Sequence, residues 1–218
     1  MIALAANDVA LIDAGGANLG SVRYALERLG LTARIVRDAD GLRGAQRVIL
    51  PGVGAAPQAM ALLRERGLDD ALRALQVPLL GVCLGMQLLF EASEEGDVAC
   101  LGLLPGRVRK LAPARGARVP HMGWNSLEPT RAASLLDGIV AGAQAYFVHG
   151  YAVPPGDDCI ATCDHGQRFA AVVQRGNVHG VQFHPERSAA VGARLLDNFL
   201  RPSTGDGPTS DADMSMPT

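Results

Sequence analysis

Residues 77–91 read VPLLGVCLGMQLLFE, and this stretch decides the fold. Residues 78–82 form a short apolar run that is typical of a buried strand, and residues 84–91 have the composition of a helix. Gly81 and Gly85 lie on either side of Cys83, which permits a tight strand-to-helix turn with the cysteine at its apex. The stretch therefore predicts one strand of a parallel sheet and the helix that follows it.

The residues before this stretch repeat the pattern. Three short apolar runs predict strands, at residues 9–13, 32–36 and 47–50. Two stretches have the spacing of amphipathic helices, namely 19–29 and 56–75, the second with a break near Gly67. Strands that alternate with helices favour a parallel sheet with right-handed crossovers.

The second half of the chain has a different pattern. Short strand candidates occur at residues 107–111, 124–127, 145–151, 160–162, 170–175 and 178–183. Several are only a few residues apart, so we expect antiparallel hairpins here, followed by a helix over 188–200. The predicted class is α/β: an open, mixed, mainly parallel sheet flanked by helices, with an antiparallel β portion in the second half.

Composition excludes several classes of protein. The 218 residues include 20 Lys and Arg against 22 Asp and Glu, so the net charge is −2 and no nucleic-acid or membrane partner is expected. The longest apolar run, 77–90, is too short to span a bilayer, and the N-terminus lacks the basic region of a signal peptide. Four cysteines do not suggest a disulfide framework. We therefore expect a cytoplasmic protein.

The last seventeen residues differ from the rest. Residues 202–218 (PSTGDGPTSDADMSMPT) are rich in Pro, Gly, Ser and Asp and show no periodicity. This composition is typical of a disordered tail. The sequence thus predicts one domain over 1–201 and a disordered C-terminal tail.

Cys83 is the first candidate for chemistry. A cysteine at a helix N-terminus is stabilised as the thiolate, and the backbone N–H of Leu84 would face an oxyanion that forms beside the sulfur. The alternative is that Cys83 is a small buried apolar residue, which is a common role for a free cysteine.

Residues 178–186 (VHGVQFHPE) supply a base for this nucleophile. Pro185 disfavours helix at His184, and residues two apart on an extended chain point to one side, so Glu186 can orient the His184 imidazole. The alternatives are a structural histidine and a carboxylate at a helix start. His121, His149, His165 and His179 compete for the role, but none has an acidic residue two positions later.

A glycine loop is expected at the same sheet edge. Residues 51–54 (PGVG) follow a predicted parallel strand, so Gly52, Val53 or Gly54 can offer a second oxyanion donor; the alternative is a plain turn. Cys159, Cys163 and His165 do not have a common zinc spacing, and a strand would put both cysteines on one buried face. We therefore expect no metal and no cofactor.

Three motifs in this order, PGVG, GVCLGMQLLFE and VQFHPE, resemble those of the class I (triad) glutamine amidotransferases over about residues 8–200. The resemblance implies a flavodoxin-like fold. Residues 120–125 (PHMGWN) and 146–151 (YFVHGY) resemble segments of one branch, the glutaminase subunits of imidazole glycerol phosphate synthases.

The resemblance implies a reaction and a partner. Cys83 would attack the amide carbon of L-glutamine, with His184 as base and acid and Glu186 as its partner. The thioester would release ammonia and then be hydrolysed to glutamate. The ammonia would pass to a cyclase subunit, a (β/α)8 barrel bound as a heterodimer, which makes imidazole glycerol phosphate and AICAR in histidine biosynthesis.

Further roles follow from matching positions. The oxyanion hole would involve Gly52, Val53, Gly54 and Leu84. The glutamine contacts would be Gln87, Glu95, His149, Gly150 and Tyr151. The residues facing the cyclase would be Asn18, Met122, Trp124 and Arg187. The chain departs from the family pattern at Ala14, where an aromatic residue is usual, at Gly150 in place of Ser, and at Arg187 in place of Lys.

Two alternatives stay open. One is the glutaminase of another ammonia-requiring enzyme such as pyridoxal phosphate synthase, which has no reason to carry PHMGWN. The other is a non-catalytic scaffold of the same fold, against which the intact set of Cys83, His184 and Glu186 argues.

Overall fold

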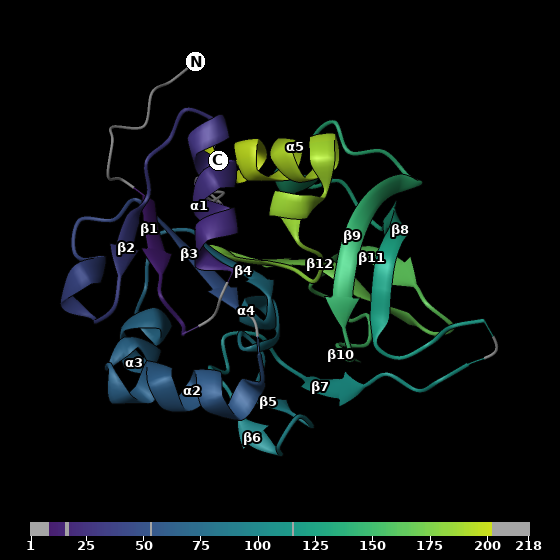
Figure 1. Cartoon of the computed structure of the whole chain (residues 1–218), viewed down its shortest axis with the longest axis horizontal. Coiled ribbons are helices and arrows are strands. Elements are labelled where there is room, and N and C mark those ends of the chain that lie inside the picture. The colour runs from purple at the N-terminus through teal and green to yellow at the C-terminus, as the bar shows by residue number, and fades with distance from the viewer. Residues whose placement is uncertain (1–8, 16–17, 53, 115, 202–218) are drawn as a thin grey trace, which may run out of the picture.

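The computed structural model describes residues 9–15, 18–52, 54–114 and 116–201, and the predicted tail lies outside them (Figure 1). The larger sheet has nine strands, in the spatial order β2 (Arg34–Val36), β1 (Val9–Ile12), β3 (Arg47–Gly52), β4 (Leu79–Cys83), β13 (Val178–Val181), β12 (Arg168–Arg175), β11 (Cys159–Asp164), β8 (His121–Pro129) and β9 (Ala143–His149). The smaller sheet has the order β10 (Tyr151–Ala152), β7 (Arg107–Lys110), β5 (Ala92–Ser93) and β6 (Val98–Ala99).

The helices are α1 (Leu19–Arg28), α2 (Ala56–Glu65), α3 (Leu68–Arg73), α4 (Leu84–Gln87) and α5 (Ala189–Leu200). Three short 3-10 turns are η1 (Asp40–Leu42), η2 (Ser134–Leu136) and η3 (Pro185–Arg187). The break predicted near Gly67 separates α2 from α3, because Gly67 has a φ of 63°.

Strand direction changes at β13. The strands from β2 to β13 are parallel, and those from β13 out to β9 are antiparallel. The expected mixed sheet with an antiparallel second half is confirmed. β13, the last strand in the described part of the chain, is thus inserted beside β4, although about a hundred residues separate the two in sequence.

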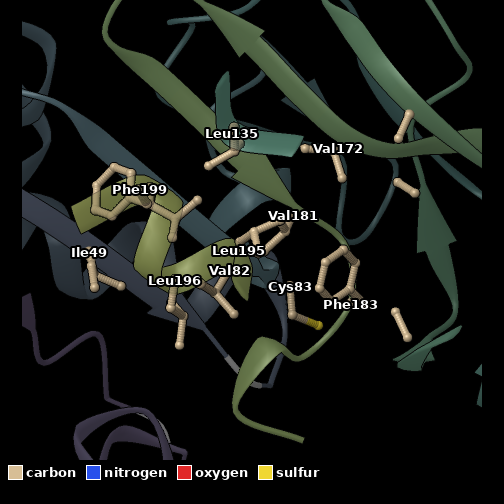
Figure 2. Close-up of a cluster of buried hydrophobic side chains, with 14 of the residues drawn as sticks. Ile49, Val82, Cys83, Leu135, Val172, Val181, Phe183, Leu195, Leu196 and Phe199 are labelled. Atoms are coloured by element: carbon tan, nitrogen blue, oxygen red, sulfur yellow. The ribbon is translucent and has the colours of Figure 1, made fainter. Parts of the chain in front are cut away.

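Both faces of the parallel strands are covered, which explains their continuous apolar runs. Alternate side chains of a strand point to opposite faces, so Leu11 and Leu80 pack with α1 and α5, whereas Ala10 and Leu79 pack with α2 and α3. Figure 1 shows these two helix pairs on opposite sides of the sheet. In Figure 2, Leu195 and Leu196 of α5 lie next to Val82 of β4 and Val181 of β13.

Two predictions about local structure are wrong. The helix expected over 84–91 ends at Gln87, because the buried residues that follow it bond instead to the loop 101–104, as in Leu103 N–H to Leu89 O at 2.8 Å. Cys159 and Cys163 do not share a face. Register shifts within β11 send Cys159 into one core cluster and Cys163 into the other.

Gly192 of α5 offers a test of how tightly the C-terminal helix packs on η3. A Cβ at Gly192 would lie 1.8 Å from the Pro185 carbonyl oxygen, so η3 would have to move. We expect Gly192→Ala to lower the free energy of unfolding by about 1–3 kcal/mol. The measurement is urea unfolding at equilibrium.

Gly20→Ala in α1 is the matched control, since in the described part of the chain no atom lies within 4 Å of the place its methyl group would take. It should leave stability unchanged or raise it by up to about 1 kcal/mol. Equal unfolding midpoints for the two variants would contradict the close packing.

Candidate functional site

Cys83 lies at the apex of the sharp turn between β4 and α4, as the glycine spacing predicts. Its φ of 54° and ψ of −111° are rare for a residue with a side chain. A Cβ at Gly81 would lie 2.6 Å from Gly85 O, and one at Gly85 would lie 1.9 Å from Leu50 O. The two glycines therefore let the turn fold back onto β3 and β4, and this close approach fixes the position of Cys83.

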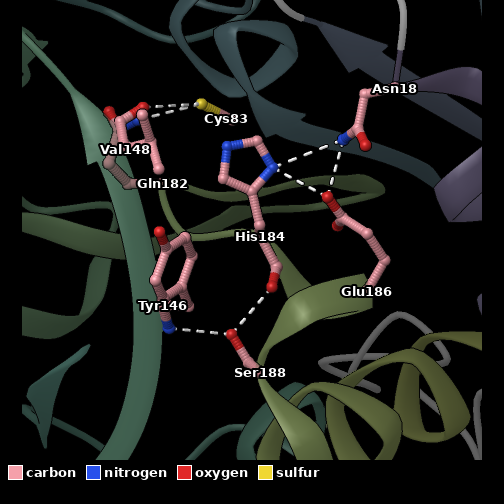
Figure 3. Close-up of polar contacts among 8 residues, drawn as sticks. All are labelled: Asn18, Cys83, Tyr146, Val148, Gln182, His184, Glu186 and Ser188. Atoms are coloured by element: carbon pink, nitrogen blue, oxygen red, sulfur yellow. Dashed lines mark hydrogen bonds and ion pairs between the residues drawn. The ribbon is translucent and has the colours of Figure 1, made fainter. Parts of the chain in front are cut away.

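His184 reaches the same edge of the sheet from the neighbouring strand. β13 runs parallel to β4, and His184 comes three residues after its end. The backbone is held on both sides: His184 N–H donates to Tyr146 O at 2.9 Å, and the Ser188 hydroxyl donates to His184 O at 2.7 Å (Figure 3). The side chain is buried beside Cys83.

His184 is extended, as expected, with φ of −95° and ψ of 98°, but the extended conformation expected to continue through Pro185 and Glu186 is wrong. Pro185 begins the 3-10 turn η3, since its fixed φ suits the first position of a turn, and Arg187 N–H donates to His184 O at 3.0 Å. The turn still brings Glu186 back onto the imidazole. His184 Nδ1–H donates to Glu186 Oε1 at 2.8 Å.

Asn18 completes this arrangement. It occupies the N-cap position of α1 but makes no side-chain cap bond there. Its Nδ2 donates instead to Glu186 Oε1 at 2.6 Å and lies 3.3 Å from His184 Nδ1. The resemblance implies a place for Asn18 at the partner face, and the sequence gives no sign of this contact, since 168 residues separate it from Glu186.

The charges of His184 and Glu186 follow from these contacts. Burial raises the pKa of Glu186, but the hydrogen bonds from His184 and Asn18 outweigh burial and hold that pKa below its usual value. Burial lowers the pKa of His184, but Cys83 and Glu186 outweigh it and raise that pKa to about 10. Because Nδ1–H is bonded to Glu186, the other ring nitrogen is turned toward Cys83 (Figure 3).

The Cys83 sulfur has two further neighbours. Sγ lies 3.7 Å from the Val148 carbonyl oxygen, to which it donates, and the Gln182 Nε2 donates to Sγ at 3.9 Å. Gln182 is completely buried. The sequence patterns assign Gln182 no role, although a lone amide within the apolar run VQF is a signal for one.

The glycine loop lies against the Cys83 turn. Gly52 pairs with Cys83 across β3 and β4, and a Cβ there would lie 2.6 Å from the Gly85 nitrogen. Leu84 is buried at the start of α4, and Gly54 has a φ of 94°. Val53 lies outside the described residues. The structure thus brings Gly52 and Leu84 beside Cys83, and their role as oxyanion donors stays a prediction.

Three of the expected glutamine contacts share one carbonyl group. Gln87 Nε2 and His149 Nδ1 both donate to Tyr151 O, each at 2.8 Å. Gly150 lies between β9, which ends at His149, and β10, which begins at Tyr151. Glu95 lies between β5 and β6 of the smaller sheet, and its Oε2 accepts from the N–H of Ala56, the first residue of α2, at 2.8 Å.

The expected partner residues lie on an open surface. Met122 and Trp124 of β8 are 65% and 53% exposed. The Trp124 ring packs edge-on against Tyr146, with ring centroids 5.9 Å apart, and the Arg187 guanidinium lies 5.0 Å from the centroid of the same tyrosine ring. An exposed group of aromatic residues and arginine is typical of a protein interface.

Other features of the structure do not compete with this site. A cavity of about 340 Å³ opens at the opposite ends of β4 and β13, but its arginines, Arg73 and Arg175, are paired with nearby aspartates. Among the described residues, no group of three or more His, Cys, Asp and Glu is arranged to hold a metal ion. No helix in the described part of the chain is long and apolar enough to cross a membrane.

Comparison with known proteins agrees with this geometry. A family described as "Glutamine amidotransferase class-I" matches residues 10–202. The imidazole glycerol phosphate synthase subunit HisH of Xanthomonas euvesicatoria pv. vesicatoria is 71% identical over 196 residues, which are 90% of this chain and 98% of the relative. The HisH subunit of Xylella fastidiosa is 68% identical over 193 residues, or 88% and 96% of the two chains.

A solved structure leads to the same family. The crystal structure of a glutamine amidotransferase superimposes with a TM-score of 0.70 at 25% identity and covers 89% of this chain and 97% of its own. The chain therefore belongs to the class I glutamine amidotransferases and, within them, to the HisH glutaminase subunits of imidazole glycerol phosphate synthase in histidine biosynthesis.

Proposed function

We propose that Cys83, His184 and Glu186 are the catalytic residues of this glutaminase subunit. The observation that supports the proposal is the order of the three groups. The Glu186 carboxylate holds Nδ1–H of His184, and the opposite side of the same ring faces the sulfur on the strained turn. This is the order of orienting acid, base and nucleophile that covalent acyl transfer requires.

The proposed reaction has two stages. The raised pKa of His184 favours a ring that has taken the thiol proton before the attack. The Cys83 sulfur attacks the amide carbon of L-glutamine, and the imidazolium gives that proton to the leaving nitrogen, so that ammonia departs and a thioester remains. Water then attacks the thioester with His184 again as base. Glutamate leaves, and the returned proton restores the thiol.

The oxyanion of each stage would lie against the turn. Leu84 N–H is the first donor in this proposal, because it is the backbone group that follows the nucleophile. The loop at Gly52, Val53 and Gly54 supplies the second. Gly52 permits the close approach of the two segments.

Glutamine would bind along the same edge through Gln87, Glu95 and the segment of His149, Gly150 and Tyr151. Gln87 donates through its nitrogen to Tyr151 O, and Glu95 accepts through Oε2 from α2. We therefore assign the Gln87 oxygen and the second Glu95 oxygen, Oε1, to the α-ammonium group of the substrate.

The ammonia would be used by a cyclase subunit, a (β/α)8 barrel that forms a heterodimer with this chain. Met122, Trp124 and Arg187 present the exposed surface for it, with Asn18 nearby behind Glu186. Residues 1–201 form a single amidotransferase domain in this proposal, in agreement with the family match. We place it in the cytoplasm, because all four cysteines are free thiols.

Replacing the proposed nucleophile should abolish activity. We expect Cys83→Ala to lower the rate of glutamate formation from glutamine by about 10⁴-fold or more, measured in the complex with the cyclase. Cys100→Ala is the control, since Cys100 is also buried and burial raises its pKa to about 11. Hydrolysis that survives in Cys83→Ala would refute the assignment.

Glu186→Gln tests the orienting role. The variant keeps the shape but loses the charge that favours the imidazolium, so the pKa of His184 should fall. We expect kcat to fall about 10²-fold or more while KM changes less than about threefold. Steady-state kinetics and an NMR titration of His184 provide the two measurements. A rise in KM alone would count against this role.

The partner surface makes a separate prediction. Trp124→Ala removes the largest exposed ring on β8. We expect it to weaken binding of the cyclase by about 10-fold or more, by titration calorimetry, since exposed aromatic residues often dominate interface energies. Val140→Ala is a control at an exposed apolar residue outside this surface. Equal affinities for the two variants would show that the interface lies elsewhere.

A further inference from the structure

We infer that His121 and His149 are positioning residues, because a chain of hydrogen bonds connects them to Cys83. His121 donates to His149 and His149 to the Tyr151 carbonyl, which also accepts from Gln87; the Gln87 amide donates in turn to Gln182, and Gln182 donates to Cys83. The inference rests on the proposed role of Cys83 as nucleophile. It assigns a function to the first residue of β8, which lies beside the exposed Met122.

The Tyr151 carbonyl group fixes the direction of the bonds that lead to it. The Tyr151 carbonyl can only accept, so His149 Nδ1 carries the hydrogen of the 2.8 Å bond and His149 Nε2 is an acceptor. His121 Nδ1 lies 3.0 Å from that Nε2 and must donate to it. His121 Nε2 is then an acceptor, and the Asn125 amide nitrogen donates to it at 3.3 Å.

Both imidazoles are neutral in this arrangement. Burial, and next the neighbouring His149, lower the pKa of His121 to about 3. Burial lowers the pKa of His149 to about 4, although its bond to Tyr151 O opposes the shift. A proton added to His149 would place two N–H groups opposite each other across the 3.0 Å contact, and one added to His121 would place its Nε2–H opposite the Asn125 amide across 3.3 Å. The hydrogen-bond chain therefore needs both rings uncharged.

The second half of the hydrogen-bond chain starts at the same Tyr151 carbonyl group. Tyr151 O also accepts from Gln87 Nε2 at 2.8 Å, and the same nitrogen donates to Gln182 Oε1 at 3.0 Å. This leaves the Gln182 nitrogen to donate to Cys83 Sγ at 3.9 Å. Both hydrogens of the Gln87 amide are engaged, which leaves its oxygen as the acceptor that we assign to the substrate.

Packing holds the His121 ring, the first ring of the hydrogen-bond chain, in place. His121 pairs with His149 across β8 and β9, and its ring is stacked on Phe147 at 4.9 Å and on His165 at 3.9 Å. His121 and His149 are 2% and 6% exposed. Buried polar groups of this kind rigidify a site when each is satisfied, and here they fix the segment that is proposed to bind glutamine.

The test uses glutamine hydrolysis by the full chain in complex with its cyclase. His121→Phe keeps a stacked ring and loses both nitrogens, and we expect kcat/KM to fall about 10-fold or more. His121→Asn keeps a donor where Nδ1 was and should recover most of the loss. His165→Phe is the control, because the His165 ring stacks on His121 and, among the described residues, forms a hydrogen bond only with Arg118 O. This variant should stay within about twofold of wild type.

The outcomes separate the two claims. An inactive wild type, or an active Cys83→Ala, would refute the proposed function. An active wild type with unchanged kinetics in His121→Phe would overturn the positioning role, and so would a loss that His121→Asn does not recover at equal melting temperature.

A second measurement does not depend on how the variants fold. Nitrogen-15 NMR of the wild-type histidines at pH 7 should show the neutral Nδ1–H tautomer at both His121 and His149. The Nε2–H tautomer, or a charged ring, at either position would overturn the inference.

Discussion

The site depends on the parallel pairing of β4 with β13. Parallel strands end at the same edge of a sheet, so this pairing brings Cys83 and His184 together although about a hundred residues lie between them. The pairing requires small residues. Gly81 and Gly180 face each other in register, and a Cβ at Gly180 would lie 2.7 Å from Met86 Cγ of α4. With Gly85, these residues let α4 lie directly on the two strands.

Three other elements hold the residues at this edge of the sheet in place. β9 holds the His184 backbone through Tyr146 O, α1 supplies Asn18 to Glu186, and α5 packs Gly192 against Pro185. Glu186 is therefore held by residues that have no direct part in the proposed chemistry. A base and its orienting carboxylate that are fixed in this way need little rearrangement when substrate binds.

The local elements could be predicted from the sequence because they depend on short patterns. Apolar runs located the parallel strands, and the glycines around Cys83 predicted the turn. Contacts between distant segments could not be predicted in this way. The sequence does not show that Asn18 reaches Glu186, that His121 meets His149 across β8 and β9, or that Gln182 donates to the sulfur. The extended conformation predicted for Pro185 and Glu186 was wrong for a related reason, since proline suits both an extended segment and the start of a 3-10 turn.

Labelling with a glutamine analogue that carries a diazoketone in place of the amide tests the central claim most directly. The reagent alkylates the nucleophile that attacks the position of the amide carbon. In the complex with the cyclase, the account predicts one label per chain, on Cys83, with protection by L-glutamine. Label on Cys100, Cys159 or Cys163, or a turning-over enzyme that takes no label, would contradict it.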